Sequence, residues 1–331
     1  QQAINDDALV PEYDPGDEVY SHLIDSLDAA IETLDPNAEG FSSTQDLIYE
    51  GDVAGWLKFA NSLKLRLAIT IADVEPQTAS TMVSEAVAGG LFLSNADNAT
   101  IQYQGAPPST NPLWEDLVQS GRADYVISNT VVDRMQDLFD PRLPVYGAGM
   151  DFEYPINPST RKKRDSVFTT GGNMVLYYPA HDSIVYKTTP FTIYAKDSSE
   201  QLQLFIGGEF GTSNTYSANS HVGDLFHEPD LEGIAMDYAE VQFLLAEAAA
   251  RGFDTPGSAA DHYEEGIRAS MEYWGVDPDN IEDYLDQPSV AYNSAPGTWR
   301  EKIGIQSWLA FYNRGFEGWT VWRRLDFSGF N

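Results

Sequence analysis

The sequence of 331 residues contains no cysteine. This absence excludes disulfide bonds, thiolate metal sites and a cysteine nucleophile within the chain. It also means that these residues include no cysteine that could carry a lipid. The cellular compartment is left open, because a chain without thiols is compatible with either redox environment.

Basic residues are scarce. There are 19 Lys and Arg against 51 Asp and Glu, which gives a formal net charge of −32. A surface this acidic repels the phosphate backbone of nucleic acids and the anionic headgroups of lipids. The composition therefore disfavours both as partners and indicates a well-solvated, acidic protein surface.

Long apolar runs are also missing, since crossing a membrane takes about 20 consecutive apolar residues. The most apolar stretch, residues 63–72, is too short and contains Lys64 and Arg66. The first residues show neither the basic nor the apolar region of a signal peptide. Because the chain does not begin with Met, we expect a processed or truncated product. No clean linker divides residues 1–331, so we expect a single composite domain.

Apolar residues with helical spacing cluster towards both ends of the chain. Small residues in two of these segments would allow close helix pairing, as in tetratricopeptide-like repeats, where neither helix buries its apolar face alone. The expected helices cover residues 16–34, 52–71, 76–88, 237–251 and 259–274, followed by two helices within 298–325 that break at 313–315.

The middle of the chain, residues 92–226, is rich in Gly, Pro, Ser, Thr and Asn. Short β-branched or aromatic runs predict strands near residues 99–103, 174–178 and 191–194, and one helix is expected over residues 129–139. The predicted fold is mostly α, with tetratricopeptide-like helix pairs, a long loop-rich region and a few short strands. Loops this extensive usually carry function.

Motifs for catalysis are absent: the sequence has no G-x-S-x-G elbow, P-loop, H-E-x-x-H or G-x-G-x-x-G. Carboxylates are so abundant that a glycosidase-like pair would arise by chance. His221 and His227 flank Asp224, but a solvated loop explains them better than a metal site. The sequence motifs therefore offer no support for a catalytic site.

Two oxygen-rich segments, Asn95–Asn98 and Asp277–Asn280, have ligands of the kind that calcium prefers. Neither matches an EF-hand loop. Asn and Asp also cap their own backbone in turns, and this explanation is the better supported of the two. A basic cluster at residues 161–164 is better explained by local ion pairs in this acidic chain than by a functional role.

Aromatic residues in the loop-rich region provide the strongest functional signal. Sugars are bound by aromatic platforms, with amides or carboxylates for their hydroxyl groups. The alternative is that these rings form small cores beneath the loops. The candidate ligand-binding residues are Trp114, Tyr146, Tyr177, Tyr178 and Tyr216, and the nearby amides are Asn111, Asn173, Asn214 and Asn219.

Several ordered segments resemble the SusD/RagB family. Residues 51–68, GDVAGWLKFANSLKLRLA, are similar to a long family motif almost without a gap. Further similar segments are SNADNA at 94–99, DYV at 124–126, DPRL at 140–143, YAEVQFLLAEA at 238–248 and KIGIQSWLA at 302–310, followed by Glu317, Trp319 and Trp322-Arg323-Arg324. These motifs are mainly helix-packing positions, so they assign no ligand contact.

The resemblance implies a lipoprotein on the outward face of a Bacteroidetes-type outer membrane. Such proteins deliver oligosaccharides, or peptides in some members, to a SusC-like TonB-dependent transporter. They are not enzymes and need no cofactor. Relative to the family, we expect the signal peptide, lipidated Cys and first helical repeats before Gln1 to be missing, as well as the C-terminal tail. A peptide-binding protein and a helical-repeat interaction scaffold remain the alternatives.

Overall fold

The computed structural model describes residues 13–151, 166–170, 173–178, 181–186, 193–194 and 203–328, with side chains in 13–149 and 205–328. The chain divides into two compact units. Unit 1 comprises residues 1–99 and 236–262, and unit 2 comprises 100–235 and 263–331. Each unit thus combines two separate stretches of sequence, and the single-domain expectation stays a prediction. Within the described residues, no helix has the length and apolar character needed to span a membrane.

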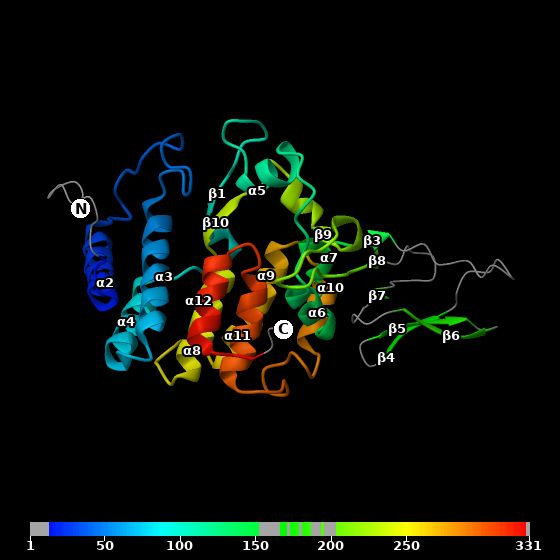
Figure 1. Cartoon of the computed structure of the whole chain (residues 1–331). Coiled ribbons are helices and arrows are strands. Elements are labelled where there is room, and N and C mark those ends of the chain that lie inside the picture. The colour runs from blue at the N-terminus through cyan, green and yellow to red at the C-terminus, as the bar shows by residue number, and fades with distance from the viewer. Residues whose placement is uncertain are drawn as a thin grey trace. The chain divides into compact units, whose positions relative to one another are not determined.

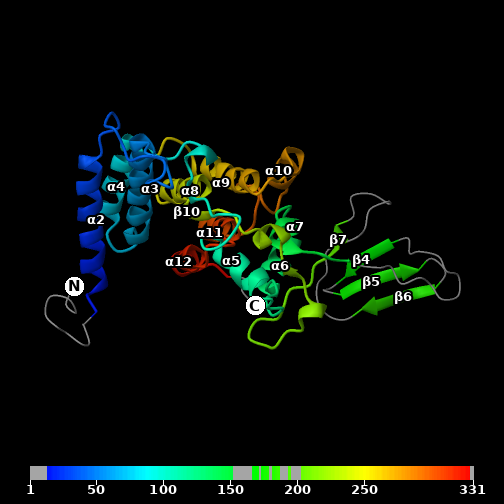
Figure 2. The same cartoon turned by 90° about the horizontal axis from the view of Figure 1, so that it is seen from above.

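Unit 1 is helical, as predicted. Figures 1 and 2 show α2, α3 and α4 lying side by side. The side chain of Asp52 caps α3 by accepting a hydrogen bond from the amide of Ala54, and Gly90, at φ +94°, ends α4. The elements are α2 (Gly16–Thr33), α3 (Val53–Ile71), α4 (Pro76–Gly89), the 3₁₀ turn η1 (Asn95–Asp97) and α8 (Tyr238–Ala250).

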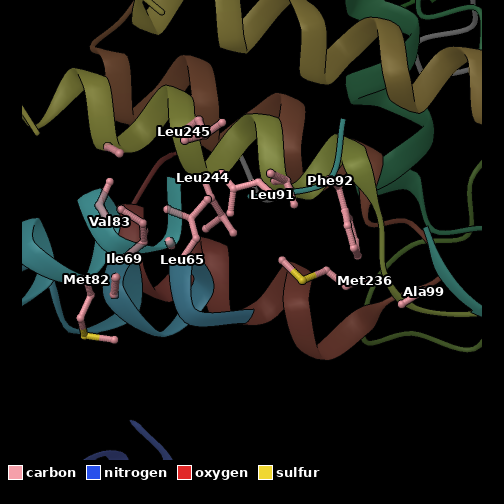
Figure 3. Close-up of a cluster of buried hydrophobic side chains, with 14 residues drawn as sticks. Leu65, Ile69, Met82, Val83, Leu91, Phe92, Ala99, Met236, Leu244 and Leu245 are labelled. Atoms are coloured by element: carbon pink, nitrogen blue, oxygen red, sulfur yellow. The ribbon is translucent and has the colours of Figure 1, made fainter. Parts of the chain in front are cut away.

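The core of unit 1 forms where α3 packs against α4 and α8. Figure 3 shows Leu65 and Ile69 of α3 together with Leu244 and Leu245 of α8, and all four side chains are buried. Burying a Leu or Ile side chain contributes roughly 1.5–3 kcal/mol. The remaining buried members are Ala68, Met82, Val83, Ala86, Leu91, Phe92, Ala99, Met236, Val241 and Ala248.

The polar residues of α3 bind the surrounding segments of unit 1. Trp56 Nε1 donates to Asp46 Oδ2 at 2.7 Å, and Lys58 Nζ donates to Asp97 Oδ1 at 2.6 Å. These contacts fix the chain on both sides of the helix, at the segment before α3 and at η1.

Further along α3, buried polar groups reach α4 and the chain that follows it. Asn61 Nδ2 donates to the Gly89 carbonyl at 2.9 Å, and Ser62 Oγ accepts from the Phe92 amide at 3.2 Å. A Cβ on Gly89 would lie 2.4 Å from the Asn61 side chain, so glycine is required for this close approach.

Two cations of α3 complete the pattern. Lys64 Nζ lies 2.8 Å from Asp28 of α2 and 2.6 Å from Glu85 of α4. Arg66 donates to both carboxylate oxygens of Glu240 on α8, at 2.6 and 2.8 Å. The long motif at residues 51–68 is thus a set of packing and pairing positions.

Asp46 lies in the segment before α3, and its side chain is almost fully buried. Burial alone would raise the pKa of Asp46, but hydrogen bonds from Trp56 Nε1 and from the amides of Gly51, Ile48 and Tyr49 together lower it. A lowered pKa in the folded state means that the ionised carboxylate stabilises the fold above its unfolded pKa.

We predict that Asp46→Asn lowers the free energy of unfolding by about 1–3 kcal/mol at pH 7, because the buried donors lose their anionic acceptor. The difference in unfolding free energy between the variant and wild type should shrink as the pH falls below 3.8, the ordinary pKa of an Asp carboxyl, and Asp46 itself becomes protonated. Urea unfolding at pH 7, 4 and 2.5 measures it. Trp56→Phe removes one donor only and should have a smaller effect. An Asp46→Asn deficit that is the same at all three pH values would contradict the prediction.

Unit 2 contains the remaining helices, apart from the first four residues of α9, which belong to unit 1. The helices predicted within residues 259–274 and 298–325 are confirmed, including the break at 313–315. The elements are α5 (Pro112–Trp114), the π-helical turn η2 (Glu115–Gln119), α6 (Asn129–Asp137), α7 (Leu143–Tyr146), the 3₁₀ turns η3 (Tyr216–Ala218) and η4 (Asp224–His227), α9 (Ala259–Tyr273), α10 (Pro278–Leu285), α11 (Trp299–Ala310) and α12 (Gly315–Leu325).

The strands are short, and those predicted near residues 99–103, 174–178 and 191–194 are present. β4 (Ser166–Thr170), β5 (Asn173–Tyr178) and β6 (His181–Tyr186) form an antiparallel sheet, visible in Figures 1 and 2. The other pairings are β1 (Ala99–Ile101) with β10 (Gly233–Met236), β2 (Gly147–Ala148) with β9 (His221–Val222), and β8 (Gln203–Leu204) with both β3 (Met150–Asp151) and β7 (Ile193–Tyr194).

The structure confirms the capping explanation for residues 277–280 and corrects the end of the helix expected over 129–139. Residues 277–280 are the start of α10: the Asp277 side chain accepts from the Asp279 amide at 3.0 Å, and Pro278 occupies the first helical position. The helix expected over 129–139 ends at Asp137, because Phe139 adopts a left-handed backbone with φ +52°.

A buried ion pair lies in unit 2. Arg142 and Asp140 are both fully buried, and the Arg142 Nε donates to Asp140 Oδ1 at 2.9 Å. Arg142 also donates to Ser270 Oγ at 3.0 Å and to Gln306 Oε1 at 3.2 Å. Burial disfavours the charge of Arg142, but the carboxylate of Asp140 outweighs burial and raises the pKa of Arg142. The DPRL motif at 140–143 is therefore structural.

We predict that Arg142→Met lowers the free energy of unfolding by about 3–5 kcal/mol, because Asp140 would remain buried without its cation. Urea unfolding followed by tryptophan fluorescence measures the loss. The matched control is Arg268→Met, which breaks the exposed pair with Glu282 and should cost less than about 1 kcal/mol. Equal losses in the two variants would contradict the prediction.

Candidate functional site

Two loops of unit 2 are held together at one backbone position, Ile127. The Ile127 amide donates to the Ser220 carbonyl at 3.0 Å, and the Ile127 carbonyl accepts from the Gly208 amide at 2.7 Å. Ile127 directly follows the loop over residues 116–126. Its partners Gly208 and Ser220 flank the two ends of the loop over residues 209–219. These bonds bring the bases of the two loops together.

The same base requires close contact between two backbone segments. The Asn129 amide donates to the Gly208 carbonyl at 2.8 Å. A Cβ built on Gly207 would lie 2.2 Å from the Cα of Asn129, so only glycine fits there. The loops consequently project from a tightly packed base.

The first loop is also fixed at its other end. Asn111 caps α5 by accepting from the Leu113 amide at 2.8 Å, and its Nδ2 donates to the Leu231 carbonyl at 2.7 Å. Thr110 Oγ1 donates to Glu115 Oε1 at 2.8 Å. The helix then continues as the π-helical turn η2, a feature that often marks functional sites.

The exposed part of this loop gathers an aromatic ring, a guanidinium and two carboxylates, which we call the Tyr125 cluster (Asp116, Arg122, Asp124 and Tyr125). Arg122 donates to Asp124 Oδ2 at 2.7 and 3.0 Å. The guanidinium carbon of Arg122 lies 5.0 Å from the centre of the Tyr125 ring, and Tyr125 Oη donates to Asp116 Oδ2 at 3.4 Å. All four side chains are exposed to solvent.

The chemistry of the Tyr125 cluster is that of a binding surface. Arg122 covers one face of the ring, so a ligand would stack on the opposite face of Tyr125. Asp116 and Asp124 offer hydrogen-bond acceptors, and Arg122 offers donors. The hydrogen bond to Asp124 raises the pKa of Arg122 and so favours its charged form. A ligand with an apolar face and a rim of hydroxyl groups would match this arrangement.

The second loop presents aromatic rings of its own. Tyr216 stacks on His221, with ring centres 3.7 Å apart and an angle of 12° between the rings. Phe210 is largely exposed at 79%. The amides expected to contact a ligand are used within the loop instead: Asn214 Oδ1 accepts from the Glu209 amide at 2.8 Å, and Asn219 Nδ2 donates to the Thr215 carbonyl at 2.8 Å.

The candidate residues predicted from the sequence take different positions in the structure. Trp114, on α5, and Tyr216, on η3, are half-buried within the two loop regions. Tyr177 and Tyr178 lie on β5, and their side chains fall outside the described residues, as do residues 161–164 and the side chain of Asn173. They stay predictions.

Tyr146 belongs to the interior of unit 2. Its side chain is fully buried. The ring stacks on that of Tyr312, with ring centres 4.3 Å apart, and lies edge-on to the ring of Trp274, with centres 5.5 Å apart. Burial raises the pKa of Tyr146, although the charge of Arg142 opposes this. A ring without an exposed face cannot stack on a ligand, so core packing explains Tyr146 and we remove it from the candidate set.

The sequence alone does not single out Arg122 and Tyr125 as candidate site residues. Asp124 and Tyr125 were recognised only as part of a family motif. The spacing Arg122-x-Asp124-Tyr125 contains the guanidinium, carboxylate and ring of the cluster, but nothing in the sequence indicates that the three side chains remain exposed.

The suggested metal ligands have other partners. Asp97 accepts from Lys58 Nζ and, at 2.7 Å, from the Leu93 amide. Asp277 caps α10, and His227 lies 4.0 Å from Asp224. Within residues 13–149 and 205–328, no group of three or more His, Asp or Glu side chains is arranged to hold a metal ion.

Comparison with known proteins identifies the family. The sequence model of a SusD-like family, described as "Starch-binding associating with outer membrane", matches residues 1–157 and 156–331, which together cover the whole chain. The chain belongs to this SusD-like family. The family description associates its members with the outer membrane. No functionally curated protein sequence matches the chain.

Solved structures confirm the mostly helical SusD-like fold. A SusD homologue from Bacteroides uniformis is 28% identical, with a TM-score of 0.69, over 96% of this chain and 61% of its own. A chitin-binding SusD homologue from Flavobacterium johnsoniae is 25% identical, with a TM-score of 0.70, over 98% of this chain and 63% of its own. The chain thus spans less than two thirds of the length of these SusD-like proteins.

Proposed function

We propose that this SusD-like chain captures oligosaccharides at the outward face of an outer membrane. The observation that carries the proposal is the family match across the chain, together with an exposed ring, guanidinium and carboxylate cluster on a loop of unit 2. Two similar structures are described as chitin-binding. The Tyr125 cluster offers a comparable ligand both stacking and hydrogen bonding.

Delivery to a SusC-like TonB-dependent transporter completes the proposed role, with the protein held at the surface as a lipoprotein. Capture and transfer require reversible binding without bond cleavage. This role fits the family, whose members are binding proteins, and it needs neither a catalytic group nor a cofactor.

Oligosaccharides suit the Tyr125 cluster better than peptides do. A peptide in extended conformation is recognised through rows of backbone hydrogen bonds at a strand edge or through a groove. The cluster instead presents one ring face with donors and acceptors around it, the arrangement that a pyranose ring requires. The net charge of −32 would favour only basic peptides.

We predict that the protein binds chitin or starch oligosaccharides in isothermal titration calorimetry, and that Tyr125→Ala weakens this binding about tenfold, which corresponds to 1.4 kcal/mol. The loss is expected because the stacking platform disappears while the exposed position leaves the fold unchanged. Arg122→Met should weaken binding to a smaller extent.

The matched control for these titrations is Phe41→Ala. Phe41 is an aromatic side chain of unit 1 that is 74% exposed, and its removal should leave the affinity unchanged. Absence of binding to every oligosaccharide tested, together with tight binding of basic peptides, would overturn the proposal. An affinity that is the same with and without Tyr125 would reject this cluster as the site.

A further inference from the structure

The last two helices of unit 2, α11 and α12, differ in charge from the rest of the chain. They pack side by side (Figures 1 and 2), and residues 298–328 have a net charge of +2 within a chain of −32. The same stretch contains four of the seven tryptophans, so it is the most aromatic part of the chain. The charged residues are Arg300, Lys302, Arg314, Arg323 and Arg324 against Glu301, Glu317 and Asp326.

One face of α12 is exposed and aromatic. Phe316 is 88% exposed and Trp319 is 55% exposed, and helical spacing places Arg323 on the same face. The guanidinium carbon of Arg323 lies 5.8 Å from the centre of the Trp319 ring. The ring centres of Trp319 and Trp322 are 4.9 Å apart, and the angle between the ring planes is 47°. We call Phe316, Trp319 and Arg323 the α12 face.

An apolar crevice of about 70 Å³ lies beside the α12 face. Its walls include Val131 of α6, Leu309 of α11 and Tyr312. Gly315 and Gly318 of α12 form part of its edge, so no side chain of α12 closes it at these two positions. Helical spacing puts Trp319 between this crevice and the exposed Phe316.

We propose that the α12 face docks an acidic segment of another protein, which inserts an apolar side chain into the crevice. Trp, Phe and Arg are enriched in the centres of protein interfaces and dominate their binding energy. Most of this chain is acidic and repels an acidic partner, whereas the α12 face carries the cation Arg323 and lies in a stretch of net charge +2, so it favours one.

The polar groups around Trp319 favour a protein over a sugar. Thr320 Oγ1 already donates to the Phe316 carbonyl at 2.8 Å, and Glu317 faces away from Trp319 by helical spacing. Arg323 is thus the one charged group on this face, whereas a sugar needs several donors and acceptors around the ring. The inference goes beyond oligosaccharide capture and holds whether or not the Tyr125 cluster binds glycans.

A displayed library of random 12-residue peptides tests the proposal. Wild-type protein should enrich peptides that contain several Asp or Glu residues and one large apolar residue. A synthetic enriched peptide should bind in fluorescence anisotropy, and raising NaCl from 0.05 to 0.5 M should weaken it several-fold. Trp319→Ala and Arg323→Glu should each reduce its affinity about tenfold or more.

Phe41→Ala again provides the matched control, because it removes an exposed aromatic ring from unit 1 and should leave peptide affinity unchanged. Circular dichroism confirms that each variant keeps its helices. The proposal is overturned if the library yields no enrichment, if enriched peptides are basic or neutral, or if Trp319→Ala leaves their affinity intact. Loss of neutral oligosaccharide binding in Trp319→Ala would assign the face to sugars and overturn it as well.

Discussion

The burial of polar side chains along α3 is the constraint on which unit 1 depends. A buried amide, hydroxyl or ammonium is costly unless it is paired. Asn61 and Lys64 are both paired with α4, Lys64 also with α2, Ser62 with the chain that follows α4, and Arg66 with α8. Since α2, α4, η1 and α8 all pack against this one helix, its polar residues determine which partner lies where, and the apolar core supplies most of the stabilisation.

Unit 2 combines a rigid interior with exposed loops. Its interior holds the Asp140–Arg142 pair and the stacked Tyr146 ring, neither of which contacts solvent. The proposed binding surface lies outside this interior, on segments fixed by backbone hydrogen bonds at Ile127. Rigid support beneath variable loops is a common arrangement for binding proteins.

The sequence predicts the helices well because their signals are local. Apolar spacing, the Asp52 cap and Gly90 together define elements that the structure confirms. Exposure is different, since it depends on contacts between distant segments. Tyr146 and Tyr125 are both tyrosines in loop-rich sequence, yet one is buried beneath Tyr312 and the other is exposed. At Asp277 a helix cap and a calcium ligand would use the same residue types, and the capping role favoured from the sequence is the one in the structure.

The shared base at Ile127 has an evolutionary consequence. Residues 127, 207, 208 and 220 are constrained by backbone pairing and by the close approach of Gly207 to Asn129. Exposed side chains such as Tyr125 and Phe210 lie outside this base, so substitutions there would change the proposed ligand surface without disturbing the base. Such a division lets ligand preference diversify rapidly between related proteins while the scaffold beneath it is preserved.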